Sequence, residues 1–227
     1  MGHIVEFPSN GSTGRGFFSP ASGGGPGVLV VQEWWGLVPH IESVCDRFAA
    51  AGFSALAPDL YRGESTTEPD EAGKLMMALN LGQAAKDCSG GIDFLLGSDD
   101  VTSSGVGVIG FCMGGGLALT VACQRPDAVK ACAPFYGIFP WPHSEPDWTR
   151  LEAPVRGHFA EKDAMFGPDA VADLQSRLDA LGKDAQLTVH RDVEHAFFND
   201  SRPEVYAPTK AEAAWSQTLD FFRASIS

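Results

Sequence analysis

The chain has 227 residues, of which 44% are hydrophobic and 20% are charged, a balance that is typical of a folded globular protein. Its 29 acidic and 16 basic residues give a net charge of −13, which disfavours nucleic acid as a partner. The apolar runs are far shorter than the roughly 18 residues needed to span a bilayer, so we expect no membrane partner.

Glycine and proline divide the chain into alternating strand-like and helix-like segments. In chain order the pattern predicts a strand at residues 28–33, a helix at 39–51, a strand at 53–57, a helical stretch in two pieces at 70–96 and a strand at 105–111. It then predicts a helix at 117–123, strands at 129–134 and 155–159, a helix at 168–181, a strand at 186–190 and a helix at 211–222. We expect Gly82 or the Ser89-Gly90-Gly91 segment to interrupt the long helical stretch.

This alternation predicts the fold class. Strands that alternate with helices of about 10–15 residues indicate βαβ units and a mainly parallel sheet covered by helices on both faces. No composition shift, repeat or low-complexity tract marks a domain boundary. We therefore predict an α/β protein with a single domain over residues 1–227.

The cysteines and the N-terminus favour a reducing compartment. The five cysteines are an odd number and never form a C-x-x-C pair, which argues against a disulfide framework and against a zinc site. The first ten residues lack the basic segment followed by an apolar one that a secretory signal would have. We expect a cytoplasmic protein that is a monomer or a weak homo-oligomer.

Residues 110–115, Gly-Phe-Cys-Met-Gly-Gly, place Cys112 between a predicted strand and a predicted helix. The segment matches the G-x-nucleophile-x-G pattern of a nucleophile elbow, with Cys in place of Ser. Glycine on either side permits a sharp turn that lifts the side chain clear of the sheet. The free N–H groups and positive dipole end of the following helix favour a thiolate and stabilise an adjacent oxyanion. We predict that Cys112 is a nucleophile, whereas the other cysteines are buried packing residues.

The same segment contains a pattern that is typical of dinucleotide-binding proteins. Residues 105–110 read G-x-G-x-x-G, but that motif must follow a strand and open a helix. Here it fills the predicted strand itself. We therefore expect no nucleotide, no other organic cofactor and no metal.

A cysteine nucleophile needs a base, and four histidines follow Cys112 in the sequence. His158 and His190 lie inside predicted strands and are interpreted as packing or surface residues. His143 lies in a Pro- and Trp-rich loop to which no strand leads. His195 follows the last predicted strand in a loop that can reach over the carboxyl edge of the sheet, so we predict that it is the base.

The base in turn needs an acid that orients it, and the acid of such elbows lies between the nucleophile and the histidine. Asp163 comes just after the predicted strand at 155–159, at the same edge of the sheet. Glu161 and Asp169 are weaker candidates nearby. We predict that Asp163 is the acid.

With Cys112, Asp163 and His195 in these places, the chain resembles the dienelactone hydrolase family of α/β-hydrolases from about residue 28 to residue 222. The resemblance depends on five segments: residues 32–36 (QEWWG), residues 57–61 (APDLY), the elbow, the Asp163 loop and residues 195–198 (HAFF). It implies an α/β-hydrolase fold and hydrolysis of a small-molecule ester or lactone. The reaction would use a Cys-His-Asp triad and pass through a thioacyl-enzyme.

The resemblance also implies roles for residues at the end of the first predicted strand. Glu33 would contact the resting nucleophile and swing away when substrate binds. The backbone N–H groups of Trp34 and Met113 would form the oxyanion hole. Trp35 and Phe198 are expected to contact the substrate.

The chain departs from the family where the substrate carboxylate is held. Well-studied members have Arg and Tyr on a helix and an Arg after the catalytic histidine, whereas this chain has Pro69, Gly73 and Asn199 at those positions. Arg62 and Arg202 could bind substrate instead, or each could be a surface charge.

Two other functions therefore stay open. The first is a broad carboxylesterase or thioesterase that acts on neutral substrates, as the missing clamp suggests. Aromatic residues that could form its pocket are Trp34, Trp35, Phe135, Phe139, Trp141 and Phe198. The second is a non-catalytic protein that binds a ligand or senses redox state through Cys112, which would leave Asp163 and His195 without a purpose.

Overall fold

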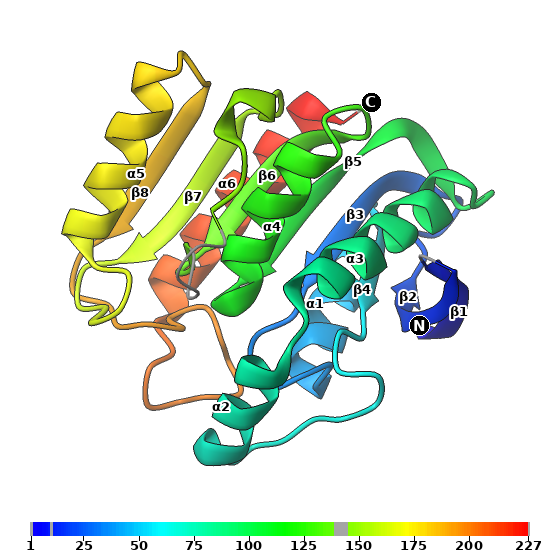
Figure 1. Cartoon of the computed structure of the whole chain (residues 1–227), viewed down its shortest axis with the longest axis horizontal. Coiled ribbons are helices and arrows are strands. Elements are labelled where there is room, and N and C mark those ends of the chain that lie inside the picture. The colour runs from blue at the N-terminus through cyan, green and yellow to red at the C-terminus, as the bar shows by residue number, and fades with distance from the viewer. Residues whose placement is uncertain (1, 10, 139–144, 227) are drawn as a thin grey trace.

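The computed structural model describes residues 2–9, 11–138 and 145–226, which form one sheet with helices on both faces (Figure 1). The strand order is β1-β2-β4-β3-β5-β6-β7-β8. The strands are β1 His3–Ser9, β2 Ser12–Ser19, β3 Gly25–Val31, β4 Ser54–Pro58, β5 Val101–Phe111, β6 Val129–Phe135, β7 Val155–Ala160 and β8 Ala185–His190. β2 pairs antiparallel with β1 and with β4, and the other neighbouring pairs are parallel. The predicted α/β class with a mainly parallel sheet is confirmed.

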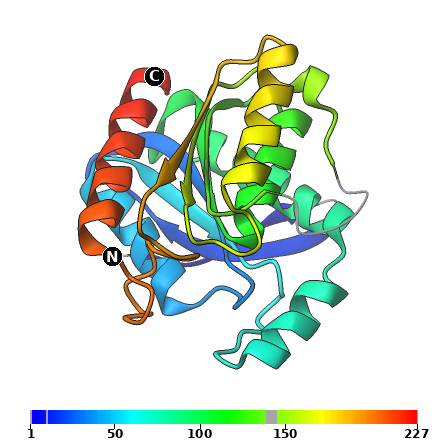
Figure 2. The same ribbon diagram turned by 90° about the vertical axis from the view of Figure 1, so that its left-hand side faces the viewer.

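The helices divide between the two faces of the sheet (Figure 2). They are α1 Pro39–Ala50, α2 Pro69–Ala78, α3 Leu81–Leu96, α4 Met113–Gln124, α5 Pro168–Ala180 and α6 Pro208–Ser225, with a short 3-10 helix at Trp148–Arg150. α3, α4 and α5 pack on one face, and α1 and α6 pack on the other. α2 projects from the body and buries only Ala72 among its residues. No helix in the described part of the chain is long and apolar enough to cross a bilayer.

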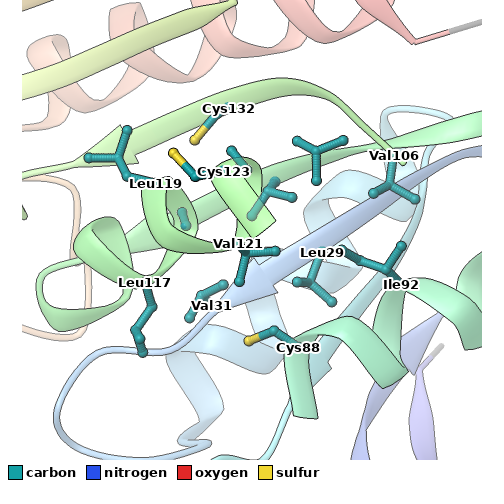
Figure 3. Close-up of a cluster of buried hydrophobic side chains, with 14 of the residues drawn as sticks. Leu29, Val31, Cys88, Ile92, Val106, Leu117, Leu119, Val121, Cys123 and Cys132 are labelled. Atoms are coloured by element: carbon teal, nitrogen blue, oxygen red, sulfur yellow. The ribbon is translucent and has the colours of Figure 1, made fainter. Parts of the chain in front are cut away.

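The central strand β3 is apolar throughout because both of its faces are covered by helices. Leu29 and Val31 face α3 and α4, where they join a cluster that contains Cys88 (Figure 3). Val28 and Val30 face the opposite side and pack with α1 and α6. Because successive side chains point to opposite faces, a strand that is covered on both faces needs apolar residues at every position.

The break in the long helical stretch lies at residues 79–80, so the predicted break at Gly82 or at residues 89–91 is wrong. Asn80 is the N-cap residue just before α3, and its side chain accepts a hydrogen bond from the backbone N–H of Gln83 at 3.0 Å. This N-cap satisfies a helix donor that would otherwise lack a partner. The glycines at the predicted positions all lie inside α3.

Candidate active site

Cys112 lies at a tight turn between the end of β5 and the start of α4. Its backbone has φ 53° and ψ −121°, a conformation that is strained for a residue with a side chain. The turn brings Gly110 so close to the helix that an added Cβ would lie 1.9 Å from the Gly114 carbonyl oxygen. Cys112 is partly exposed, whereas the other four cysteines are buried as predicted.

The end of β6 supports this turn from the side. The Cys112 N–H donates to the Phe135 carbonyl at 3.0 Å, and the Gly115 N–H donates to the Cys112 carbonyl at 2.9 Å. A Cβ on Gly137 would lie 1.7 Å from that same Cys112 carbonyl oxygen. The strained turn is therefore held by close backbone packing on two sides.

His195 and Asp163 meet above the carboxyl edge of the sheet. His195 Nδ1 lies 2.6 Å from Asp163 Oδ2, and the Asp163 side chain is almost fully buried. The other carboxylate oxygen, Oδ1, accepts the backbone N–H groups of Met165 at 2.8 Å and Phe166 at 3.0 Å. These donors fix the carboxylate, and the carboxylate fixes the imidazole.

The electrostatics of the pair favour a charged imidazolium. Burial lowers the pKa of His195, but hydrogen bonds to Asp163 and Cys112 and the charges of both outweigh burial and raise it to about 10. Burial raises the pKa of Asp163, but the His195 hydrogen bond and the two backbone donors bring it below its usual value. Asp163 and Cys112 therefore both favour the protonated form of His195 at neutral pH.

Glu33 follows the end of β3 and is buried beside this pair. Its Oε2 accepts a hydrogen bond from Asn199 Nδ2 at 2.7 Å, and its Oε1 accepts one from the Tyr136 hydroxyl at 3.3 Å. Burial and the neighbouring Glu33 and Cys112 raise the pKa of Tyr136 well above its usual value, so the hydroxyl stays a donor. The Tyr136 ring also packs edge-on against His195, with centroids 5.2 Å apart.

Sequence reasoning did not identify Tyr136, and it noted Asn199 only as a departure from the family. Tyr136 directly follows β6, which ends at the same sheet edge as β3 and β5. A polar residue at the carboxyl end of a parallel strand is a signal that could have identified it.

A cavity of about 110 Å³ opens beside Cys112 and His195. Seven predicted site residues line it: Glu33, Trp34, Trp35, Cys112, Met113, His195 and Arg202. Its other walls come from Met76, Met165, Phe166 and Ala196. Arg202 is the one Lys or Arg among these lining residues, and its guanidinium lies 5.8 Å from the centre of the Trp35 ring.

Two predicted substrate contacts are not brought to this cavity. Phe198 is fully buried and stacks on Phe111, with ring centroids 5.3 Å apart, and Phe135 is also buried in this cluster. Arg62 lies over a separate cavity, where its Nη2 is 3.2 Å from Asp87 Oδ2. Neither side chain lines the cavity beside Cys112.

The histidines in strands are packing residues, as predicted. His158 Nδ1 lies 3.0 Å from His190 Nε2, and both rings are buried. Burial lowers the pKa of His158 to about 3 and also lowers that of His190, so both stay neutral. The remaining residues considered above, Phe139, Trp141 and His143, lie outside the described residues.

No group of three or more His, Cys, Asp or Glu side chains that could hold a metal ion occurs in the described ranges. The functional groups that come together at this site are a thiol, an imidazole and carboxylates. Together with the N-terminus of α4, these groups can support attack on a carbonyl carbon.

Comparison with known proteins places the chain in a family. The chain matches the Dienelactone hydrolase family over residues 16–226. "Protein usf" of Aquifex pyrophilus is 38% identical and "Putative carboxymethylenebutenolidase" of Aquifex aeolicus is 36% identical, each over 98% of this chain and 98% of its own length. The crystal structure of a "Putative Dienelactone Hydrolase" from Klebsiella pneumoniae has a TM-score of 0.88 at 27% identity and covers 98% of both chains. The chain therefore belongs to the dienelactone hydrolase family and has its α/β-hydrolase fold.

Proposed function

We propose that this hydrolase cleaves carboxylic esters or lactones, with Cys112 as nucleophile, His195 as base and Asp163 as the orienting acid. One observation carries the proposal. The imidazole of His195 lies 2.6 Å from Asp163 and lines the same cavity as the partly exposed Cys112, which raises the pKa of His195. The Aquifex aeolicus relative supports the substrate class, because the butenolide in its name is an unsaturated lactone.

In the first half of the reaction the Cys112 thiolate attacks the acyl carbon. The developing oxyanion is stabilised by the Met113 N–H, which has no partner within the helix because it belongs to the first residue of α4, and by the Trp34 N–H. The carbon–oxygen bond breaks, and the leaving oxygen takes the His195 proton. The product is a thioester on Cys112.

In the second half His195 accepts a proton from a water molecule that attacks this thioester. The carbon–sulfur bond then breaks, which releases the carboxylic acid and restores the thiolate with its imidazolium. Asp163 stays ionised throughout and holds the Nδ1–H of His195, as its lowered pKa favours.

The cavity favours activated acyl groups with an apolar body. A thiolate is a good leaving group, so enol esters, aryl esters and thioesters react more readily than amides. Trp34, Trp35 and Phe166 offer aromatic walls. Arg202 donates its Nε–H to Glu204 at 2.9 Å, and its remaining N–H groups can bind a carboxylate on the substrate.

A second candidate is an esterase or thioesterase for neutral substrates. One observation favours it, because the position four residues after His195 carries the neutral amide of Asn199, which bonds to Glu33. The ratio of kcat/KM on a neutral aryl ester to that on a carboxylate-bearing lactone separates the two candidates. An Arg202→Gln variant should lower only the rate on the lactone.

The nucleophile is tested by trapping the acyl group. Incubation with p-nitrophenyl acetate and acid quenching should yield one acetyl group, on the peptide that contains Cys112. Cys112→Ala should lose about 10³-fold or more in kcat. Cys123→Ala, which removes a buried thiol, is the matched control and should keep wild-type turnover. Unchanged turnover in a folded Cys112→Ala variant would refute the assignment, and an adduct without turnover would indicate a non-catalytic protein.

A further inference from the structure

Glu33 is a buried carboxylate that is held by neutral groups. Its side chain is 1% exposed, and no Lys, Arg or His nitrogen lies within ion-pair distance of it in the described part of the chain. Its two oxygens accept from Asn199 and Tyr136 instead. A buried carboxylate needs such donors because burial removes its water.

Hydrogen bonds from Ser201 orient the Asn199 amide toward this carboxylate. Its Oδ1 accepts the backbone N–H of Ser201 at 3.1 Å and the Ser201 hydroxyl at 2.6 Å. Both are donors, so the opposite end of the amide, Nδ2, must point to Glu33. Asn199 is itself 1% exposed, and its backbone N–H donates to the Ala196 carbonyl at 2.9 Å. The amide thus links Glu33 to the loop that carries His195.

We propose that Asn199 is a positioning residue that keeps the Glu33 carboxylate fixed beside Cys112. The inference rests on the proposed function and deepens it. A carboxylate held at both oxygens does not swing away when substrate binds, unlike the movement that the family resemblance implies. No anionic substrate is then needed to displace Glu33, and a neutral ester suffices to acylate Cys112.

A double-mutant cycle on the full chain tests this coupling. With p-nitrophenyl acetate, Asn199→Ala should lower kcat about tenfold and leave KM within about twofold. The substitution removes one of the two hydrogen bonds that hold the Glu33 carboxylate, which is then no longer fixed beside Cys112. In a Glu33→Ala background the same substitution should cost less than about twofold, since its partner is gone. Asn80→Ala, which deletes an exposed helix cap outside this cavity, controls for loss of an asparagine and should leave kcat unchanged.

The two proposals fail in different ways. Equal losses from Asn199→Ala in both backgrounds would show that Asn199 supports the loop and not Glu33, which overturns the inference. So would a wild-type protein that is acylated by a carboxylate-bearing lactone but not by p-nitrophenyl acetate. Turnover that survives Cys112→Ala would instead overturn the proposed function. If Asn199→Ala does not fold, Ser201→Ala frees the amide oxygen and should give a smaller loss with the same dependence on Glu33.

Discussion

Replacement of Asp163 by asparagine inverts the hydrogen bonding of His195. The backbone N–H groups of Met165 and Phe166 both donate to Oδ1, so the amide oxygen of Asp163→Asn must take that place. Its NH₂ group then faces His195 Nδ1, where the wild-type protein has a carboxylate oxygen at 2.6 Å. Nδ1 must become an acceptor, so the ring proton moves to Nε2. In that tautomer the ring cannot accept a proton on the side that faces Cys112.

The size of the effect follows from the electrostatics of the pair. The pKa of His195 is about 10 against an ordinary 6.5, a difference equivalent to about 5 kcal/mol in favour of the imidazolium. Asp163 and Cys112 both contribute to this stabilisation. Asp163 supplies part of it through its hydrogen bond and its charge, and each 1.4 kcal/mol that is lost corresponds to about tenfold in rate. The inverted tautomer adds to this, so we expect kcat to fall by about 10³-fold.

The assay is the initial rate of p-nitrophenyl acetate hydrolysis at pH 7.5, with the fold checked by near-ultraviolet circular dichroism. Glu161→Gln and Asp169→Asn are matched controls, because each removes an exposed carboxylate, in the loop after β7 or in the first turn of α5, and both are rival candidates for the acid. They should stay within about twofold of wild type, as is usual for surface substitutions. A folded Asp163→Asn variant that keeps a third of wild-type kcat would refute the tautomer argument.

Two further predictions concern stability. Gly137→Ala should lower the free energy of unfolding by about 3 kcal/mol, because its Cβ would lie 1.7 Å from the Cys112 carbonyl oxygen. The control Gly73→Ala places its Cβ in open space and should be neutral or stabilising. Urea unfolding measures both free energies, and equal stabilities would contradict the packing argument. The pKa of His158 is about 3 in the folded protein and 6.5 in the unfolded chain. Between pH 7 and pH 5 the unfolded chain therefore binds a proton at His158 that the folded protein does not bind. The free energy of unfolding falls by about 2 kcal/mol over this range. His158→Gln should lack that part of the pH dependence, and an unchanged dependence would show that His158 is not its source.

The sequence predicted the parallel part of the sheet because its strands are buried on both faces. Apolar runs between glycine and proline located β3 to β8, and Glu33, Cys112 and Asp163 lie at the ends of those runs or shortly after them. The carboxyl ends of parallel strands lie at one edge of the sheet, so the positions of these residues at strand ends were enough to predict that they lie close together.

The N-terminal hairpin of β1 and β2 was not predicted, because its glycines look like turns. In β2 a Cβ on Gly16 would lie 2.5 Å from the Ala57 carbonyl oxygen, so glycine serves close pairing with β4 there. A strand that needs glycine for close approach of another backbone shows neither an apolar run nor clean alternation.

The direction in which a side chain points was the other feature that the sequence did not predict. Phe198 and Arg62 lie near the predicted edge, yet one points into the core and the other pairs with Asp87. The bond between Glu33 and Asn199 joins positions that are 166 residues apart. Neither feature leaves a local pattern, because both are decided by tertiary packing.

Three residues at the site have a strained backbone conformation. Cys112, Tyr136 and Ala196 all have positive φ, at 53°, 36° and 64°, and each lies in a segment that shapes the site. Such a conformation costs roughly 1–3 kcal/mol for a residue with a side chain, so the surrounding structure must hold it. Tyr136 is fully buried, and its N–H donates to the His158 carbonyl at 2.7 Å. The neighbouring strands thus stabilise the turns that expose the Cys112 thiol and orient the His195 imidazole. Such a strained turn at a residue other than glycine is marked in the sequence only by the glycines that pack against it.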